Sequence, residues 1–128
     1  MKRTITIVVL FVLLIVLATY ELVMVDKIIT KLDNLTLTIQ TEIKNNKDDI
    51  TVATNSITET KSFWDKHEDN LCLMFNHKDL STITDTLSRL LSYAENNDYD
   101  NAIVEANLLK EYSEKNRHIM GFNMQNFL

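Results

Sequence analysis

Three residues close together in the sequence have side chains that often bind metal ions or attack substrates: His67, Cys72 and His77. They follow one another at intervals of five residues. A helix turns by about 100° per residue, so Cys72 would point roughly 140° away from His67. Helical zinc ligands are usually about four residues apart, which places them on one face. The spacing therefore predicts neither a metal centre nor a cofactor site.

His67 and Cys72 each have a simpler interpretation. His67 lies on an apolar stripe, which predicts a histidine at the edge of the core, hydrogen-bonded by a neighbouring helix. A pH sensor would use the same position, because histidine titrates near neutrality. Cys72 has no identifiable base beside it, which predicts a small buried apolar group rather than a nucleophile. A disulfide between chains would instead require Cys72 to be exposed. We expect the protein not to be an enzyme.

Aromatic and methionine side chains gather near these residues and are the other candidates for a site. A pocket for a small ligand would be lined by Trp64, Phe63, His67 and Met74, and His77 would extend the same surface. At helical spacing, however, aromatic residues and methionine usually belong to the core. These five residues form the candidate ligand or partner surface predicted from the sequence.

The elements that position this surface begin with an apolar segment. Thr4 to Tyr20 contain no charged residue, and Leu22 to Val25 continue the apolar character after Glu21. The segment from Thr4 to Val25 is long enough to cross a hydrocarbon layer of about 30 Å. Lys2 and Arg3 precede it and acids follow it, which predicts a cytoplasmic N-terminus and a body outside the cytoplasm. The expected localisation is the cell membrane, with a single span.

Residues 1–25 are predicted to be an uncleaved signal-anchor. The alternative is a signal peptide cleaved after Ala18, which would leave a secreted helical protein. The stripe that starts at Leu22 and Val25 continues through Ile29 and Leu32 to Ile43 with steps of three and four residues. Cleavage after Ala18 would therefore remove the first turn of a structural helix, which favours the anchor.

The rest of the chain, residues 26–128, is predicted to be all-α. The sequence has no proline and one glycine, Gly121, whereas sheets need turn residues at many corners. Further stripes predict an antiparallel bundle of about four helices, at about 26–44, 49–75, 78–95 and 98–119. Asn76 is expected to cap the third helix, and Asn97 or Asp98 the fourth. Gly121 is expected to end the fourth helix, and the apolar tail 122–128 to pack on the bundle.

Charge and cysteine content narrow the function classes. The net charge of −5 argues against binding to nucleic acid and against electrostatic docking to anionic lipid, since a basic surface is what attracts phosphate groups. A single cysteine excludes a disulfide framework within the chain.

Several short motifs resemble domain-of-unknown-function family 4363. They are Trp64-Asp-Lys-His67, His77-Lys-Asp-Leu80, the register of Leu87 and Leu90, Ala102, and the closing Asn126-Phe-Leu. The chain departs from the family where helix two begins, with Ile50 and Thr51 in place of an aromatic and an acidic residue. The resemblance implies a small membrane-anchored helical protein of bacteria, typical of clostridia and their relatives. It implies no activity, because the family has none assigned.

Two functions follow from these observations. The first is a non-enzymatic interaction or accessory module that binds a membrane or envelope protein, or another copy of itself. The second is an extracytoplasmic sensor or binding domain for a small ligand. If the stripe from Leu22 to Ile43 packs against the other helices, the body is self-contained. If the stripe is exposed, a partner must cover it, because a long exposed apolar face is not tolerated.

Overall fold

The computed structural model describes the backbone of residues 1–72 and 74–127 and the side chains of those up to His118. Over these residues the chain is helical and has no strand. The elements are α1 (Lys2–Asn45), the short 3-10 helix η1 (Ile50–Ala53), α2 (Thr54–Leu71), α3 (His77–Glu95) and α4 (Tyr99–Phe127). The predicted all-α fold with about four helices is confirmed.

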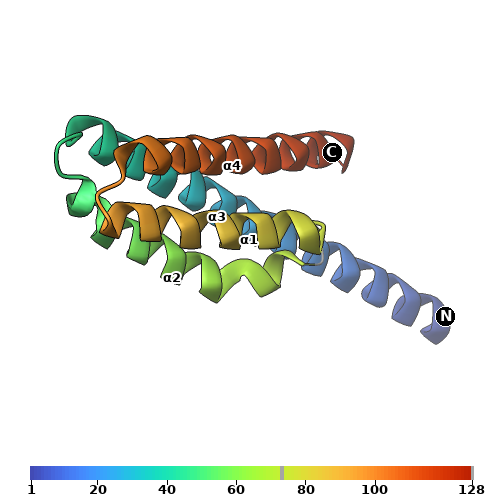
Figure 1. Cartoon of the computed structure of the whole chain (residues 1–128). Coiled ribbons are helices and arrows are strands. Elements are labelled where there is room, and N and C mark those ends of the chain that lie inside the picture. The colour runs from blue at the N-terminus through green and yellow to red at the C-terminus, as the bar shows by residue number, and fades with distance from the viewer. Residues whose placement is uncertain (73, 128) are drawn as a thin grey trace.

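The four α-helices form a bundle in which each helix packs against two others. The contacts run from α1 to α2, α2 to α3, α3 to α4, and from α4 back to α1 (Figure 1). Short connections join successive helices, so neighbours in sequence are antiparallel, as in other up-and-down bundles. The core between them contains aliphatic side chains from all four helices together with Trp64.

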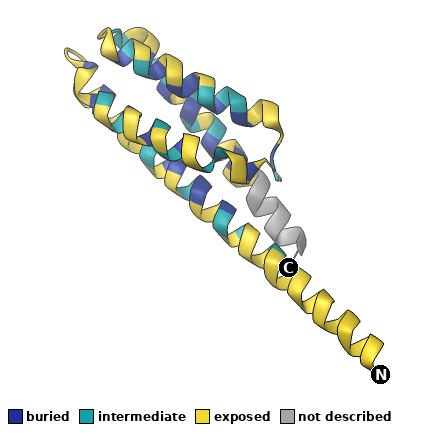
Figure 2. Ribbon diagram, turned by 90° about the horizontal axis from the view of Figure 1, so that it is seen from below, coloured by how far each residue is buried: buried dark blue, intermediate teal, exposed yellow. Residues whose placement is uncertain are grey.

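Helix α1 has two parts with opposite surroundings. Its N-terminal part projects beyond the bundle and is exposed, whereas from Val25 onward one face is buried (Figure 2). By length and composition α1 could cross a membrane, and none of its most apolar stretch is covered by the protein. The other helices cover the apolar stripe from Val25 to Ile43, so the body is self-contained. We call the end of the bundle near Val25 the anchor end.

The second helix differs from the prediction at both ends. Its first turn is the 3-10 helix η1, where the Asp49 carboxylate accepts a hydrogen bond from the Thr51 backbone N–H at 3.2 Å. The α-helix then ends at Leu71 rather than at residue 75. Cys72 follows this end and is exposed, so the prediction of a buried thiol is wrong.

The starts of α3 and α4 follow the predicted capping pattern. The side chain of Asn76 accepts a hydrogen bond from the Lys78 N–H at 3.0 Å, which confirms it as the cap of α3. Asp98 has the same role for α4 and accepts from the Asn101 N–H at 3.3 Å. Helix α4 continues through Gly121, so the predicted stop there is wrong. The predicted packing of the tail 122–128 concerns side chains outside the described residues.

Asn97 closes the end of the bundle opposite the anchor end. Its backbone has φ 54°, a left-handed conformation that asparagine tolerates better than most residues. Its side-chain oxygen accepts a hydrogen bond from the Ile50 N–H at 2.9 Å, and its amide nitrogen donates to the Asp48 carbonyl at 3.2 Å. The loop between α3 and α4 is thereby joined to the loop between α1 and η1.

Candidate functional site

The structure does not bring the five residues predicted as a surface into one pocket. Trp64 is 0% exposed and belongs to the core. Its indole N–H donates to the Thr84 hydroxyl at 2.8 Å, and this hydroxyl donates to the Glu68 carboxylate at 2.8 Å. This hydrogen-bonded chain joins α2 to α3, so the indole N–H serves the packing of two helices.

Phe63 and His67 lie together on the other side of α2, where it packs against α1. Their rings are 4.5 Å apart between centroids, and the Lys31 ammonium lies 4.8 Å from the centre of the Phe63 ring. Nδ1 of His67 lies 2.8 Å from the Phe63 carbonyl oxygen. His67 is therefore at the edge of the core, as predicted, but its hydrogen-bond partner is on its own helix rather than on a neighbouring one.

These two rings belong to a groove at the anchor end, which we call the α1–α2 groove. It has a volume of about 410 Å³. The α1 side of the groove consists of Met24, Lys27, Ile28 and Lys31, and the α2 side of Phe63, His67 and Asn70. The α1 residues recur at intervals of three or four, so they share one face of that helix.

The remaining residues of the predicted surface lie elsewhere at the anchor end. Met74, in the connection between α2 and α3, faces Ala18, Glu21 and Leu22 across a hollow of about 170 Å³. His77 is exposed in the first turn of α3. The connection between α2 and α3 therefore lies against the C-terminal part of the apolar segment of α1.

A cluster of charges that was not predicted joins α1 to α4. The carboxylate of Asp33, with a side chain only 8% exposed, accepts hydrogen bonds from Lys110 at 2.6 Å and from the Ser113 hydroxyl at 2.9 Å. Arg117 contacts its second oxygen at 3.3 Å. Lys110 also lies 3.4 Å from the exposed carboxylate of Glu114. A buried carboxylate is thus compensated by two cations and one hydroxyl, as a buried charge requires.

The surroundings of Asp33 have opposing effects on its acidity. Burial alone would raise the pKa of Asp33, because it disfavours the charged form. The hydrogen bonds from Lys110 and Ser113 and the positive charges of Lys110 and Arg117 outweigh burial, so the pKa lies below its ordinary value of 3.8. Asp33 is therefore ionised at neutral pH and acts as a fixed negative charge within the bundle.

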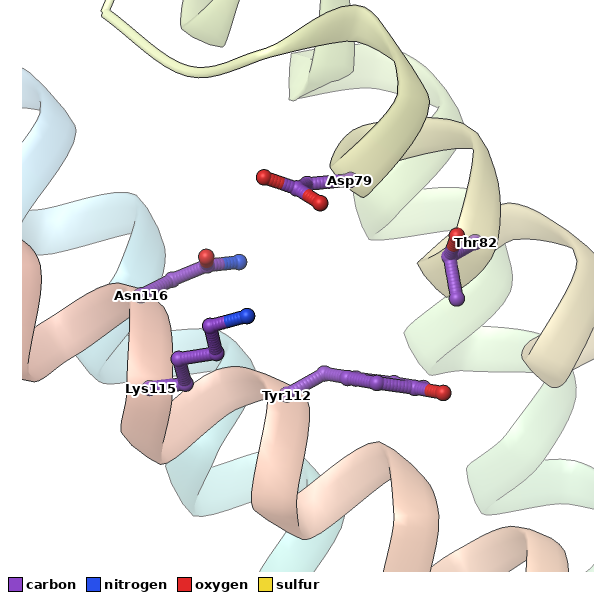
Figure 3. Close-up of a pocket in the computed structure, with 5 residues that line it drawn as sticks. All are labelled: Asp79, Thr82, Tyr112, Lys115 and Asn116. Atoms are coloured by element: carbon purple, nitrogen blue, oxygen red, sulfur yellow. The ribbon is translucent and has the colours of Figure 1, made fainter.

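A small polar pocket lies between α3 and α4, also at the anchor end. It has a volume of about 140 Å³ and is lined by Asp79, Thr82, Tyr112, Lys115 and Asn116. The carboxylate of Asp79, the ammonium group of Lys115 and the amide of Asn116 point into the space between the two helices (Figure 3). Groups of opposite charge face a common space here, an arrangement that suits a small polar ligand.

The chain matches the model of a protein family described as Domain of unknown function (DUF4363) over residues 19–127. The match covers most of the chain. The protein belongs to the DUF4363 family. Searches of curated proteins and of solved structures found no match to it.

The DUF4363 match includes every residue that lines the α1–α2 groove, the polar pocket and the Asp33 cluster. The family description assigns no activity, so the chemistry of the site must be inferred from the arrangement of its side chains. Among the described residues, no group of three or more histidine, cysteine or acidic side chains is arranged to hold a metal ion. In this DUF4363 protein, the features with distinctive chemistry gather at the anchor end.

Part of what the sequence prediction missed had a signal in the sequence. Asp33 is four residues after Ile29 and three before Thr36, so it falls on the buried stripe of α1. Ser113 similarly continues the stripe of Ala106 and Leu109 on α4. Polar residues at such core positions indicate a buried polar contact between helices. Which two helices share it depends on the three-dimensional packing.

Proposed function

We propose that this protein is a single-pass membrane-anchored module that works by binding a partner protein at the bilayer surface. The continuous helix α1 carries this proposal, because its exposed apolar segment leads directly into the buried core at Val25. A body attached in this way stays against the membrane. The α2–α3 connection beside Ala18 and Leu22 adds a second contact at this level.

The charges around the span support a topology with the N-terminus in the cytoplasm and the body outside it. Lys2 and Arg3 precede the span, and the next charges along the chain are acidic, at Glu21 and Asp26. In this topology the body and the span would be available to a partner in the membrane or the cell envelope.

The roles of the reactive side chains favour binding over catalysis. The Trp64 indole N–H is satisfied by Thr84, and Nδ1 of His67 by a carbonyl of its own helix. Asp33 is neutralised by Lys110 and Arg117. Trp64 and Asp33 hold helices together, and Nδ1 of His67 is bonded within α2, so the hydrogen-bonding capacity of these atoms is used within the fold.

The face of α1 that is buried in the bundle is not available to a partner, which limits where the partner could bind. The apolar stripe of α1 from Val25 to Ile43 is covered by the other helices. The partner would therefore meet the span within the bilayer, or the surface at the anchor end. A membrane protein can reach both, and a second copy of the chain would present the same surfaces.

Co-purification of the full chain tests this proposal. We expect the tagged protein, extracted in mild detergent, to recover one specific membrane protein or to have the mass of a defined oligomer. A matched variant carries an unrelated apolar span of equal length and retains residues 26–128. Loss of the partner in this variant would assign the contact to the span, and retention to the body. A strictly monomeric protein with no recovered partner would contradict the proposal.

The polar pocket between α3 and α4 favours a second candidate, a sensor for a small ligand. Asp79 and Lys115 offer opposite charges to one ligand (Figure 3). The sole tryptophan, Trp64, contacts Thr84 on α3, two residues after Thr82 of the pocket. We expect a bound ligand to change its fluorescence. An unchanged emission across a panel of zwitterionic metabolites would exclude this candidate.

A further inference from the structure

The α1–α2 groove combines an apolar side with cationic groups. Met24, Ile28 and Phe63 contribute the apolar surface. The polar groups of the lining are Lys27, Lys31, His67 and Asn70. No acidic residue lines the groove, although the chain as a whole has a net charge of −5. An acidic protein therefore presents a local site suited to an anion that carries an apolar part.

Two acidic residues of α2 that are near this groove in sequence, Asp65 and Glu68, have partners elsewhere. The Glu68 carboxylate accepts the hydrogen bond from Thr84 on α3. The Asp65 carboxylate pairs with Lys61 of its own helix at 3.4 Å. On α1, Glu21 lines the adjoining hollow beneath Met74. The positive charge of the groove is therefore not neutralised by its lining.

The donors of the groove fit a phosphate group. Lysine binds phosphate as a mobile point charge with three N–H donors, and the Asn70 amide adds two more. The aromatic face of Phe63 holds the Lys31 ammonium at 4.8 Å, which restricts where that cation can lie. Nδ1 of His67 is engaged by the Phe63 carbonyl, so the lysines and Asn70 provide the donors for a phosphate.

The depth of the groove matches the headgroup layer of a bilayer, given the membrane anchoring proposed above. The bundle begins at Val25, where the exposed apolar part of α1 ends. Lys27 and Lys31 lie about 5 Å and about 10 Å beyond Met24 along the helix axis, at about 1.5 Å per residue. A headgroup layer is roughly 5–8 Å thick on each side of the hydrocarbon. Met24 then lies at the boundary with the hydrocarbon and Lys27 lies within the headgroup layer. Lys31 is about one helical turn further out, and helical side chains lean toward the N-terminus, which directs its ammonium group back toward that layer.

We propose that the α1–α2 groove binds the phosphate-bearing headgroup of an anionic membrane phospholipid. The lysines and Asn70 contact the phosphate, and Met24, Ile28 and Phe63 contact the glycerol and the first acyl carbons. The anchor fixes the groove at the depth where such lipids are concentrated. This lipid is a specific ligand of the bundle, held between α1 and α2.

Native mass spectrometry of the full-length protein in detergent, titrated with phosphatidylglycerol, tests this proposal. We expect one lipid to remain bound and the double variant Lys27→Gln/Lys31→Gln to bind it roughly thirtyfold more weakly, since each cation near a membrane surface contributes about one kcal/mol. The matched control is Lys44→Gln/Lys47→Gln, which removes the same charge at the opposite end of the bundle and should bind as the wild type does. The variant Lys27→Arg/Lys31→Arg should retain binding. Equal affinity in the two glutamine variants would overturn the proposal.

Further measurements distinguish an anionic lipid from other ligands of the groove, and a failure of this proposal from a failure of the proposed membrane anchoring. Displacement of the lipid by millimolar inorganic phosphate would overturn the proposal in favour of a soluble anion. Equal binding of phosphatidylcholine and phosphatidylglycerol would overturn the assignment to an anionic lipid. Circular dichroism of each variant confirms that the bundle is folded. Extraction of the cellular protein by alkaline carbonate would contradict membrane anchoring, whereas loss of lipid binding in a protein that stays in the membrane would refute the groove alone.

Discussion

The ammonium nitrogen of Lys110 lies 2.6 Å from the carboxylate of Asp33, and this ion pair joins α4 to α1 across 77 residues of sequence. No loop connects these two helices directly. The pair lies near the anchor end, about two turns beyond Val25. This ion pair therefore helps to hold α4 against α1 close to the end of the bundle where the apolar segment begins.

Replacement of Asp33 should destabilise the fold strongly. In Asp33→Ala, Lys110 loses its carboxylate partner in a largely buried place, and such losses typically cost about 3 kcal/mol in the free energy of unfolding. Urea unfolding in detergent, followed by Trp64 fluorescence, measures the change. The control is Glu114→Ala, which removes the exposed partner of the same lysine and should cost less than about 1 kcal/mol. Equal effects of the two substitutions would contradict the role of burial.

The lowered pKa of Asp33 predicts the direction of acid sensitivity. The unfolded chain binds a proton at Asp33 more readily than the folded chain, so stability rises with pH in this range. The contribution of Asp33 is complete above its ordinary pKa of 3.8 and is lost as the pH falls through the lower folded value. Asp33→Asn should be less stable at neutral pH, and the difference from wild type should shrink as the pH falls below about 3.8. A constant difference across this range would contradict the prediction.

Asn97 should be sensitive to replacement for two separable reasons. Asn97→Gly loses the hydrogen bonds to Ile50 and Asp48 but suits the left-handed backbone, and should cost about 1–2 kcal/mol. Asn97→Ala loses the same bonds and adds about 1 kcal/mol of backbone strain. Thermal unfolding ranks the variants. Asn96→Ala, which removes an exposed bond to the Ser92 carbonyl of its own helix, should have little effect. If Asn97→Ala is as stable as Asn97→Gly, the argument from the left-handed backbone is wrong.

The exposed thiol of Cys72 provides a test of the proposed topology. It is the sole cysteine and lies where α2 has ended. A membrane-impermeant maleimide should label it in intact cells if the body lies outside the cytoplasm, and Cys72→Ser is the control for specificity. The intact mass of the labelled protein also shows whether residues 1–18 remain attached. Labelling that requires permeabilised cells would place the body in the cytoplasm.

The sequence predicted much of the fold because the apolar stripes are regular. The three–four steps from Val25 to Ile43 give the buried face of α1, and Asn76 and Asp98 mark the starts of α3 and α4. Gly121 did not stop α4, because glycine lowers helix stability without preventing helix formation. Cys72 was expected to be buried because it has no identifiable base beside it, but α2 ends at Leu71 and the thiol that follows is exposed.

The candidate site was harder to predict because its parts come from different helices. Phe63 and His67 were singled out, but their partners Lys27 and Lys31 are more than thirty residues away in sequence. Trp64, their neighbour in sequence, points to the opposite side of α2, toward Thr84. Periodicity gives the face of a helix, but the packing of helices decides what that face meets.

The unbroken course of α1 from Lys2 to Asn45 has a mechanical consequence. In the membrane anchoring proposed above, the span and the body share one helix and would tilt together, as parts of a single lever. Spans adjust their angle to the thickness of the bilayer, commonly by some tens of degrees. The far end of α1 lies about 30 Å beyond Val25, so a tilt of about ten degrees would displace it sideways by roughly 5 Å. The orientation of the body would thereby report the thickness of the bilayer that holds it.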